Sequence, residues 1–171
     1  IRDSSKEVWA KAQSDERGQA DYFKKNKKRY KWEQPRFKGI AYYTKDKNDV
    51  KAVRKVVKHL PFDQWTEKLH STFNNDSILR IKVEKGIFKA GDNSLVDRNV
   101  FGKKVPLKLE KDYPYAATYG KKLKVPKDYR DVKAQVVADY QDELEKQWVE
   151  RLRKQYAVTV NRSVLATVNK H

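Results

Sequence analysis

The sequence contains no cysteine and no methionine, and it has only three histidines among 171 residues. Without cysteine the chain cannot form a disulfide, a zinc ribbon or a thiolate nucleophile. No run of about 18 apolar residues is present, so no segment is expected to insert into a membrane. The N-terminus shows neither a signal-peptide core nor an initiator methionine, and a helical pattern is already under way there. We therefore expect Ile1 to lie inside a longer chain.

Sequence motifs for common cofactor and metal sites are also missing. The chain has no glycine-rich dinucleotide or phosphate loop, no metalloprotease helix and no EF-hand loop. His59 follows Lys58 at an expected helix end, where an interaction with the helix dipole is the commoner role, and His70 lies on a helix flank. We expect no cofactor, no metal and no catalytic histidine.

The composition predicts a folded and highly polar protein. Four tryptophans, ten tyrosines and six phenylalanines are too many for a disordered chain. A chain of this length buries roughly 70% of its unfolded surface, so it needs no disulfide or metal to fold. It fits one domain with an appended element, or two small domains.

The net charge of +17 is concentrated in the first third of the chain. The segment from Lys24 to Trp32 combines cations with aromatic residues, a pattern that a nucleic-acid interface also shows. The alternative is a solvated helix end whose aromatic residues are core anchors. Lysine predominates over arginine here, and cations suit the last turn of a helix. We favour the solvated helix end, and nucleic-acid binding stays the alternative function.

The middle of the chain alternates between helical and strand patterns. Strand formers occupy 36–43, with Ala41 and Tyr43 on one face and Ile40 and Tyr42 on the other. Helical spacing follows in the segments 48–60 and 62–73, separated by Pro61. Further strands are expected at 78–84, 105–109 and 115–119. Together they predict an α+β fold with a small mixed sheet and helices on one face.

The end of the chain predicts a long helix. An apolar residue recurs every four positions from Val132 to Leu152, which gives one apolar face. We expect this helix to pack on an N-terminal helix through Val8, Trp9 and Ala12, and to end before a short strand at 158–160. The predicted segments are an N-terminal helical part (1–33), an α+β domain (34–125) and a C-terminal helix with a short strand (126–171).

Three motifs in this order resemble the parvulin-type peptidyl-prolyl isomerases, and more closely the SurA-like periplasmic folding factors of Gram-negative bacteria. The family's tyrosine-rich helix end is matched by Tyr22, Phe23, Asn26 and Tyr30. Its glycine turn is matched by Gly86, Ile87, Phe88 and Gly91, and the residues after that turn by Val100 and Phe101. The resemblance covers roughly residues 6–168. It implies a parvulin-like sheet and a periplasmic location.

The resemblance also implies a substrate groove, which this chain would line with Ala41, Phe88, Phe101 and Ala116. Active parvulins carry histidines where this sequence has Ala41 and Ala116, so both imidazoles are missing. The resemblance therefore implies a module that binds unfolded or proline-containing polypeptide, including outer-membrane clients, with weak or absent isomerase activity. We expect this module to have no catalytic residue, to bind no nucleic acid and not to insert into a membrane.

Overall fold

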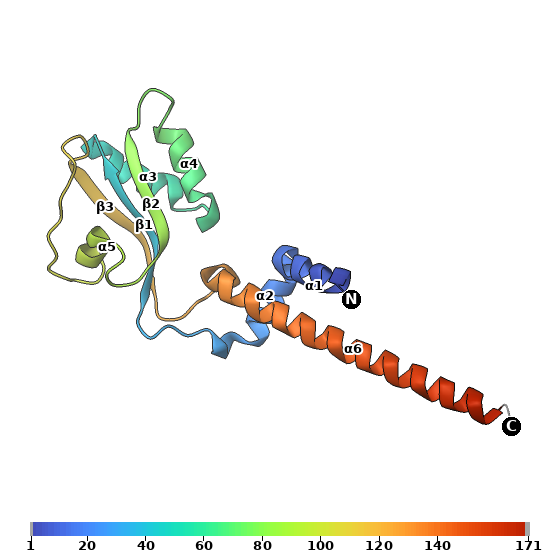
Figure 1. Cartoon of the computed structure of the whole chain (residues 1–171). Helices are drawn as coiled ribbons and strands as arrows, with labels where there is room; N and C mark the ends of the chain where they lie inside the picture. The colour runs from blue at the N-terminus through green and yellow to red at the C-terminus, as the bar shows by residue number, and fades with distance from the viewer. Residues whose placement is uncertain (1, 170–171) are drawn as a thin grey trace. The chain divides into compact units, whose positions relative to one another are not determined.

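The computed structural model describes residues 2–169, and the side chains of residues 6–158 (Figure 1). Residues of the chain form two compact units. The helical unit contains the described residues of Ile1–Tyr30 and Pro126–His171, and the sheet unit spans Lys31–Val125. No helix in the described part of the chain combines the length and the apolar character that a membrane crossing needs.

The sheet unit is built on three antiparallel strands. β1 (Arg36–Thr44) lies between β2 (Ile81–Phe88) and β3 (Tyr115–Leu123). Successive side chains of a strand point to opposite faces. Ile40 and Tyr42 of β1 accordingly belong to one hydrophobic cluster and Ala41 to another, as the sequence predicts.

The first cluster packs two helices on one face of the sheet. α3 (Lys47–Val57) contributes Val53 and Val57, and α4 (Trp65–Phe73) contributes its apolar stripe to the same cluster. A short 3-10 turn, η2 (Phe62–Gln64), lies between these helices. Asp46 caps α3, because its side chain accepts a hydrogen bond from the Asn48 amide.

The second cluster occupies the opposite face. It is covered by the short helix α5 (Ser94–Asn99) and by the segment 100–107, which supplies Phe101 and Leu107. α5 was not expected from the sequence, and it begins where the Asn93 side chain accepts a hydrogen bond from the Val96 amide. Figure 1 shows α5 on one side of the strands and α4 on the other. Helices therefore cover both faces and not one alone.

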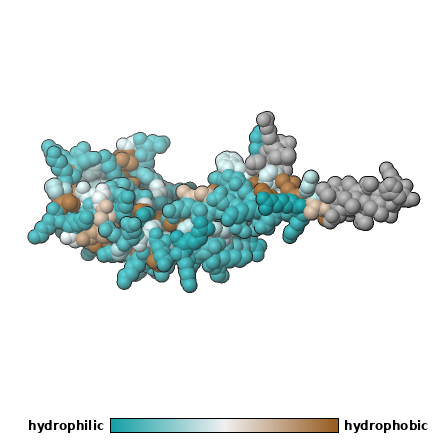
Figure 2. Space-filling view, turned by 60° about the horizontal axis from the view of Figure 1, so that its bottom comes forward, coloured by the Kyte–Doolittle hydropathy of each residue, from teal (hydrophilic) through white to brown (hydrophobic). Residues whose placement is uncertain are grey.

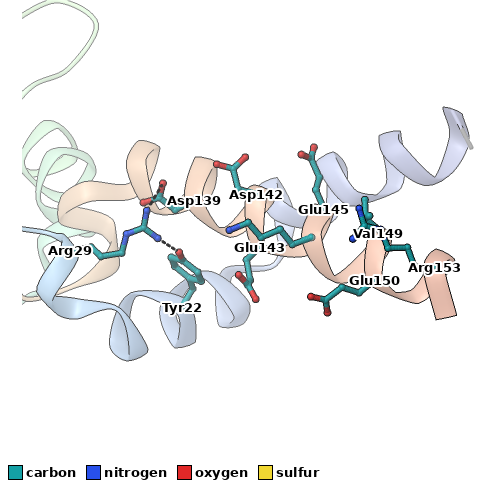
Figure 3. A pocket seen from close by; sticks show the side chains of 10 residues that line it. Tyr22, Arg29, Asp139, Asp142, Glu143, Glu145, Val149, Glu150 and Arg153 are labelled. Carbon is teal, nitrogen blue, oxygen red and sulfur yellow. Dashed lines mark hydrogen bonds and ion pairs between the residues drawn. The ribbon is translucent and has the colours of Figure 1, made fainter.

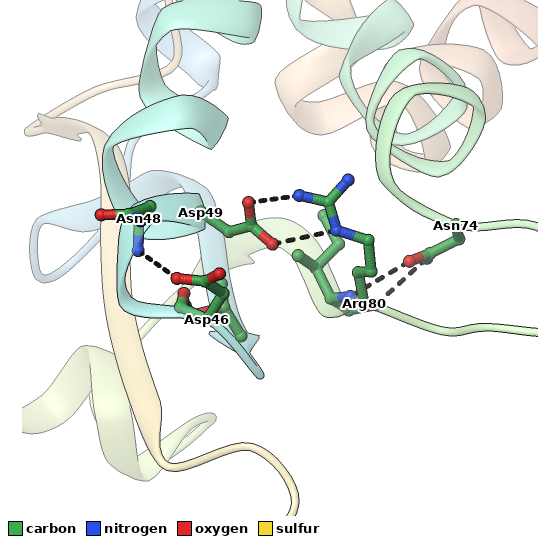
Figure 4. Close-up of polar contacts among 7 residues, drawn as sticks. Asp46, Asn48, Asp49, Asn74 and Arg80 are labelled. Atoms are coloured by element: carbon green, nitrogen blue, oxygen red, sulfur yellow. Dashed lines mark hydrogen bonds and ion pairs between the residues drawn. The ribbon is translucent and has the colours of Figure 1, made fainter.

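An ion pair between the exposed Arg80 and the buried Asp49 joins the segment that enters β2 to α3 (Figure 4). The Arg80 guanidinium donates to both carboxylate oxygens of Asp49, over 2.6 and 3.2 Å, and Asp49 is almost wholly buried. The Asn74 side chain holds the first residue of β2 by two hydrogen bonds with the backbone of Ile81. Bidentate pairing satisfies a buried carboxylate that would otherwise destabilise the fold.

The helical unit consists of two short helices and one long one. α1 (Arg2–Ser14) and α2 (Glu16–Lys25) both pack on α6 (Lys133–Asn169), which follows the 3-10 turn η3 (Tyr129–Val132). The turn η1 (Lys27–Arg29) follows α2. Phe23, Tyr30 and Val136 form the buried cluster of this unit. The expected packing of the N-terminal helix on the long C-terminal helix is confirmed.

Four details differ from the sequence-based expectations. The sheet is antiparallel in all its described pairings and not mixed. The segment 105–109 is not a strand, because Pro106 lacks a backbone donor and no described strand pairs with it. Val158–Val160 continue α6, since a helix satisfies its own backbone whereas a strand needs a neighbour. Trp9 is 55% exposed, while Val8 and Ala12 are buried.

Close backbone contact between β1 and β3 predicts a specific sensitivity to side chains. A Cβ atom on Gly39 would lie 2.3 Å from the Tyr119 carbonyl oxygen, whereas a Cβ atom on Gly86, which pairs with Gly39 from β2, would meet only the Phe88 ring at 3.7 Å. Gly39→Ala should therefore lower the free energy of unfolding by about 1 to 3 kcal/mol or more. Gly86→Ala is the matched control and should lower it by less. Urea denaturation of both variants measures the difference, and equal losses would contradict the close-contact explanation.

A tyrosine–carboxylate hydrogen bond between α6 and the start of α2 predicts a pH-dependent effect. The Tyr140 hydroxyl donates to Asp15 over 2.7 Å, which lowers the pKa of Asp15, while burial and this bond raise the pKa of Tyr140 to about 12. Tyr140→Phe should lower the free energy of unfolding by about 0.5 to 1.5 kcal/mol near neutral pH.

The same substitution should matter less in acid. Because the pKa of Asp15 is lower in the folded chain, its contribution is complete above the unfolded pKa near 3.8 and is lost as the pH falls through the folded value. The difference between the wild type and Tyr140→Phe should therefore shrink below about pH 4. Thermal melts across pH 3 to 7 measure it, and a difference that stays constant would refute the role of Asp15.

Candidate functional site

The four residues that the resemblance assigns to a substrate groove come together on one face of the sheet. Ala41 lies in the middle strand, Phe88 ends β2, Ala116 lies near the start of β3, and Phe101 follows α5. All four belong to the second hydrophobic cluster or pack against it. The sheet register explains this, because Ala116 pairs with Tyr43, two residues from Ala41 on the same face.

This cluster is closed over two of the four residues. Ala41 is fully buried and Phe88 is 5% exposed, and the Phe37 and Phe88 rings stack with their centroids 6.4 Å apart. Leu95 and Val96 of α5 complete the buried part. Phe101 and Ala116 are half-buried at its margin. The cluster therefore packs as core around Ala41 and Phe88 and reaches the surface beside Ala116.

Two side-chain contacts hold the segment between α5 and β3 against β2 and the residues just before it. Lys82 forms an ion pair with Glu110 over 2.7 Å, and this bond raises the pKa of Lys82. The Tyr113 hydroxyl donates to the Leu79 carbonyl over 2.7 Å. Lys82, Glu110 and Tyr113, together with Tyr43, line a polar pocket of about 350 Å³. The segment before β3 is thus a fixed wall rather than a free loop.

A larger groove opens where the cluster reaches the surface. It has a volume of about 660 Å³ and is bounded by α3, α5 and the segment before β3. Its apolar lining is Val50, Leu95, Leu107, Leu109, Pro114, Tyr115 and Ala116. Its charged lining is cationic throughout and consists of Lys47, Lys51 and Arg98, with Asn48 and Asn99 as the neutral polar residues. Of the four expected residues, only Ala116 lines it.

The groove offers binding surface rather than reactive groups. Its described lining has amides, cations and one tyrosine, but no imidazole and no carboxylate to act as a general acid or base. Sequence reasoning did not single out its other residues. The sequence contains only an indirect indication of the groove. Leu107 and Leu109 alternate with other residues in a segment that resembles a strand in sequence, but this segment contains Pro106 and lines a surface in the structure.

The basic segment Lys24–Trp32 follows one buried aromatic residue, Phe23, and contains another, Tyr30. Phe23 and Tyr30 are buried with stacked rings, and Tyr30 donates to Asp139 over 2.8 Å. Burial and this hydrogen bond raise the pKa of Tyr30. The four lysines between them are exposed. These aromatic rings anchor the helical unit, so they are not available to stack on bases.

A second cleft lies along α6 in the helical unit (Figure 3). Its volume is about 510 Å³, and acidic residues from Asp139 to Glu150 line it together with Tyr22, Arg29, Lys146 and Arg153. These acidic residues extend along about 16 Å of helix, so they do not converge on one point. Arg29 pairs with Asp139. The cleft is a mixed-charge surface beside the contact of α2 with α6.

Figure 2 shows a mostly hydrophilic face with small, separate apolar areas. His59 and His70 are both exposed, and His70 Nδ1 lies 3.2 Å from the Asn74 side-chain nitrogen. Neither histidine lines the groove.

Comparison with protein-family models, curated proteins and solved structures finds no match to this chain.

Phe88 tests whether the closed cluster is core. Because the ring is 5% exposed and stacks on Phe37, Phe88→Ala should lower the free energy of unfolding by about 3 to 5 kcal/mol. Phe101→Ala, which truncates a half-buried ring at the margin of the same cluster, should cost clearly less. Chemical denaturation compares the two, and a Phe88→Ala variant as stable as the wild type would show that the ring lines an open surface.

Proposed function

We propose that this chain is a polypeptide-holding module of a periplasmic protein-folding factor, parvulin-like in fold, with weak or absent prolyl isomerase activity. Its ligands are unfolded polypeptides, among them proline-containing and outer-membrane clients. The observation that carries the proposal is the meeting of Ala41, Phe88, Phe101 and Ala116 in one cluster. They come from four separate parts of the sequence, and only the resemblance to parvulins grouped them beforehand.

The groove beside Ala116 supplies the surface that such a module needs. Binding of unfolded chain depends on apolar area that is exposed in the free protein but can be covered by a client. Leu109 and Tyr115 line the groove and are each 39% exposed, so they can bury further area on binding.

Isomerase activity requires more than apolar contact. The uncatalysed barrier to rotation about a prolyl bond is about 20 kcal/mol, and catalysis requires tighter binding of the twisted amide than of the planar one. Alanines at 41 and 116 offer no hydrogen bond to a polar network across the cluster. Each lost factor of ten in rate corresponds to about 1.4 kcal/mol, so loss of such a network lowers activity by one or more decades.

A single-residue comparison tests this function. Leu109→Ser removes an exposed apolar side chain from the groove, and Ile78→Ser removes one that is 52% exposed and does not line it. The wild-type chain should suppress aggregation of a chemically unfolded enzyme diluted into buffer. Leu109→Ser should do so about threefold to tenfold less well, whereas Ile78→Ser should match the wild type.

Two further readings on the same samples separate the alternatives. Raising the salt concentration should weaken client holding little, whereas binding to nucleic acid would fall steeply. A protease-free assay on a proline-containing peptide should show a rate near the spontaneous one. No suppression of aggregation, together with tight salt-sensitive binding to random-sequence RNA, would overturn the proposal in favour of nucleic-acid binding.

A further inference from the structure

The groove lies across an edge of the sheet. Tyr115 and Ala116 are consecutive in β3, so their side chains point to opposite faces, and both line the groove. The helices that bound it, α3 and α5, contact β3 from those opposite faces. The strand order places β3 at an edge, with β1 as its neighbour on one side. The outer edge at the start of β3 therefore lies within the groove.

This part of the edge lacks the usual protection against strand pairing. Sheet edges are commonly protected by charged residues, above all lysine. β2, the other edge, carries Lys82, Glu84 and Lys85 along its length, and the end of β3 carries Lys121 and Lys122. The stretch Tyr115–Tyr119 has no charged residue. Its backbone pairs with β1 alone in the part of the chain that the structure describes.

Charge around the groove selects among the segments that could pair there. Lys47 and Lys51 lie on α3 and Arg98 lies on α5, so cations stand on both sides of the strand edge. The described lining has no acidic residue to neutralise them. A bound segment with acidic residues on each side of an apolar centre would meet complementary charge at both walls and apolar residues at the floor.

We propose that the groove binds an extended polypeptide segment, with an apolar centre and acidic flanks, as an added strand on the outer edge of β3. Backbone hydrogen bonds to Tyr115–Tyr119 supply affinity that is independent of side chains, and the cations supply the preference for acidic flanks. The proposal rests on the proposed function, since it specifies where and how the holding module takes its client.

Synthetic peptides test the proposal on the full chain. The probe is a fluorescent peptide of alternating valine and threonine with aspartates at both ends, and its partner carries lysines instead. The aspartate peptide should bind at least about threefold more tightly. The double variant Lys47→Glu with Lys51→Glu should weaken its binding about threefold to tenfold and strengthen that of the lysine peptide.

The net charge of the chain demands a matched control. Lys55→Glu with Lys58→Glu changes the same helix region by the same charge, outside the groove lining. If the positive surface as a whole attracts the aspartate peptide, both double variants will weaken it equally and the proposal is overturned. If the groove binds it, the control variant stays close to the wild type.

Backbone methylation tests the added strand. A probe N-methylated at alternate residues, on the edge that would face β3, loses the donors for pairing and should bind at least about tenfold more weakly. Methylation on the opposite edge leaves those donors in place and should have little effect. Equal affinity of the two methylated probes overturns strand pairing.

Failure of this inference is distinguishable from failure of the proposed function. A chain that suppresses aggregation of an unfolded enzyme, yet shows no preference for acidic flanks and no methylation effect, holds clients elsewhere. A chain that suppresses no aggregation fails at the earlier step, whatever the peptides do.

Discussion

The pairing of β1 with a strand on each side determines the organisation of the sheet unit. Its alternating side chains define two apolar faces, and each face needs its own cover: α3 and α4 on one, α5 and the segment before β3 on the other. Gly39 makes this pairing possible, since a Cβ there would meet the backbone of β3. The groove follows from the same arrangement. The elements that cover the two faces, α3 on one and α5 on the other, leave the edge of β3 open between them.

The helical unit is held by a different combination of forces. Apolar contact around Phe23, Tyr30 and Val136 does not by itself fix the position of α6 along the segments that it packs against. Two tyrosine–carboxylate hydrogen bonds, Tyr30 to Asp139 and Tyr140 to Asp15, fix the position of α6 against the segments before it. The first of these bonds also explains why the lysine-rich segment carries Tyr30, since this residue anchors α6.

Features that depend on neighbouring residues were predicted correctly from the sequence. Features that depend on a packing partner from elsewhere in the chain were not. The alternation in β1 and the helical spacing that forms α4 need only neighbouring residues, and both are confirmed. The segments 105–109 and 158–160 have strand-like composition, but a strand forms only beside another strand. α5 was missed because six residues carry too short a period to detect. The groove was missed because its walls come from three distant segments.

The groove therefore offers a binding surface rather than reactive side chains. If the histidines of active parvulins are replaced by Ala41 and Ala116, the cluster around them gains by packing closely, since an alanine leaves no polar group unsatisfied in an apolar interior. Closing that cluster removes the place where a prolyl bond would twist, but it also supports β3 from beneath. An edge strand that is held in place is pre-organised for pairing. Binding then costs only the conformational entropy that the client loses. Under the proposed function, weak or absent isomerase chemistry and an edge that holds unfolded chain are two consequences of the same packing.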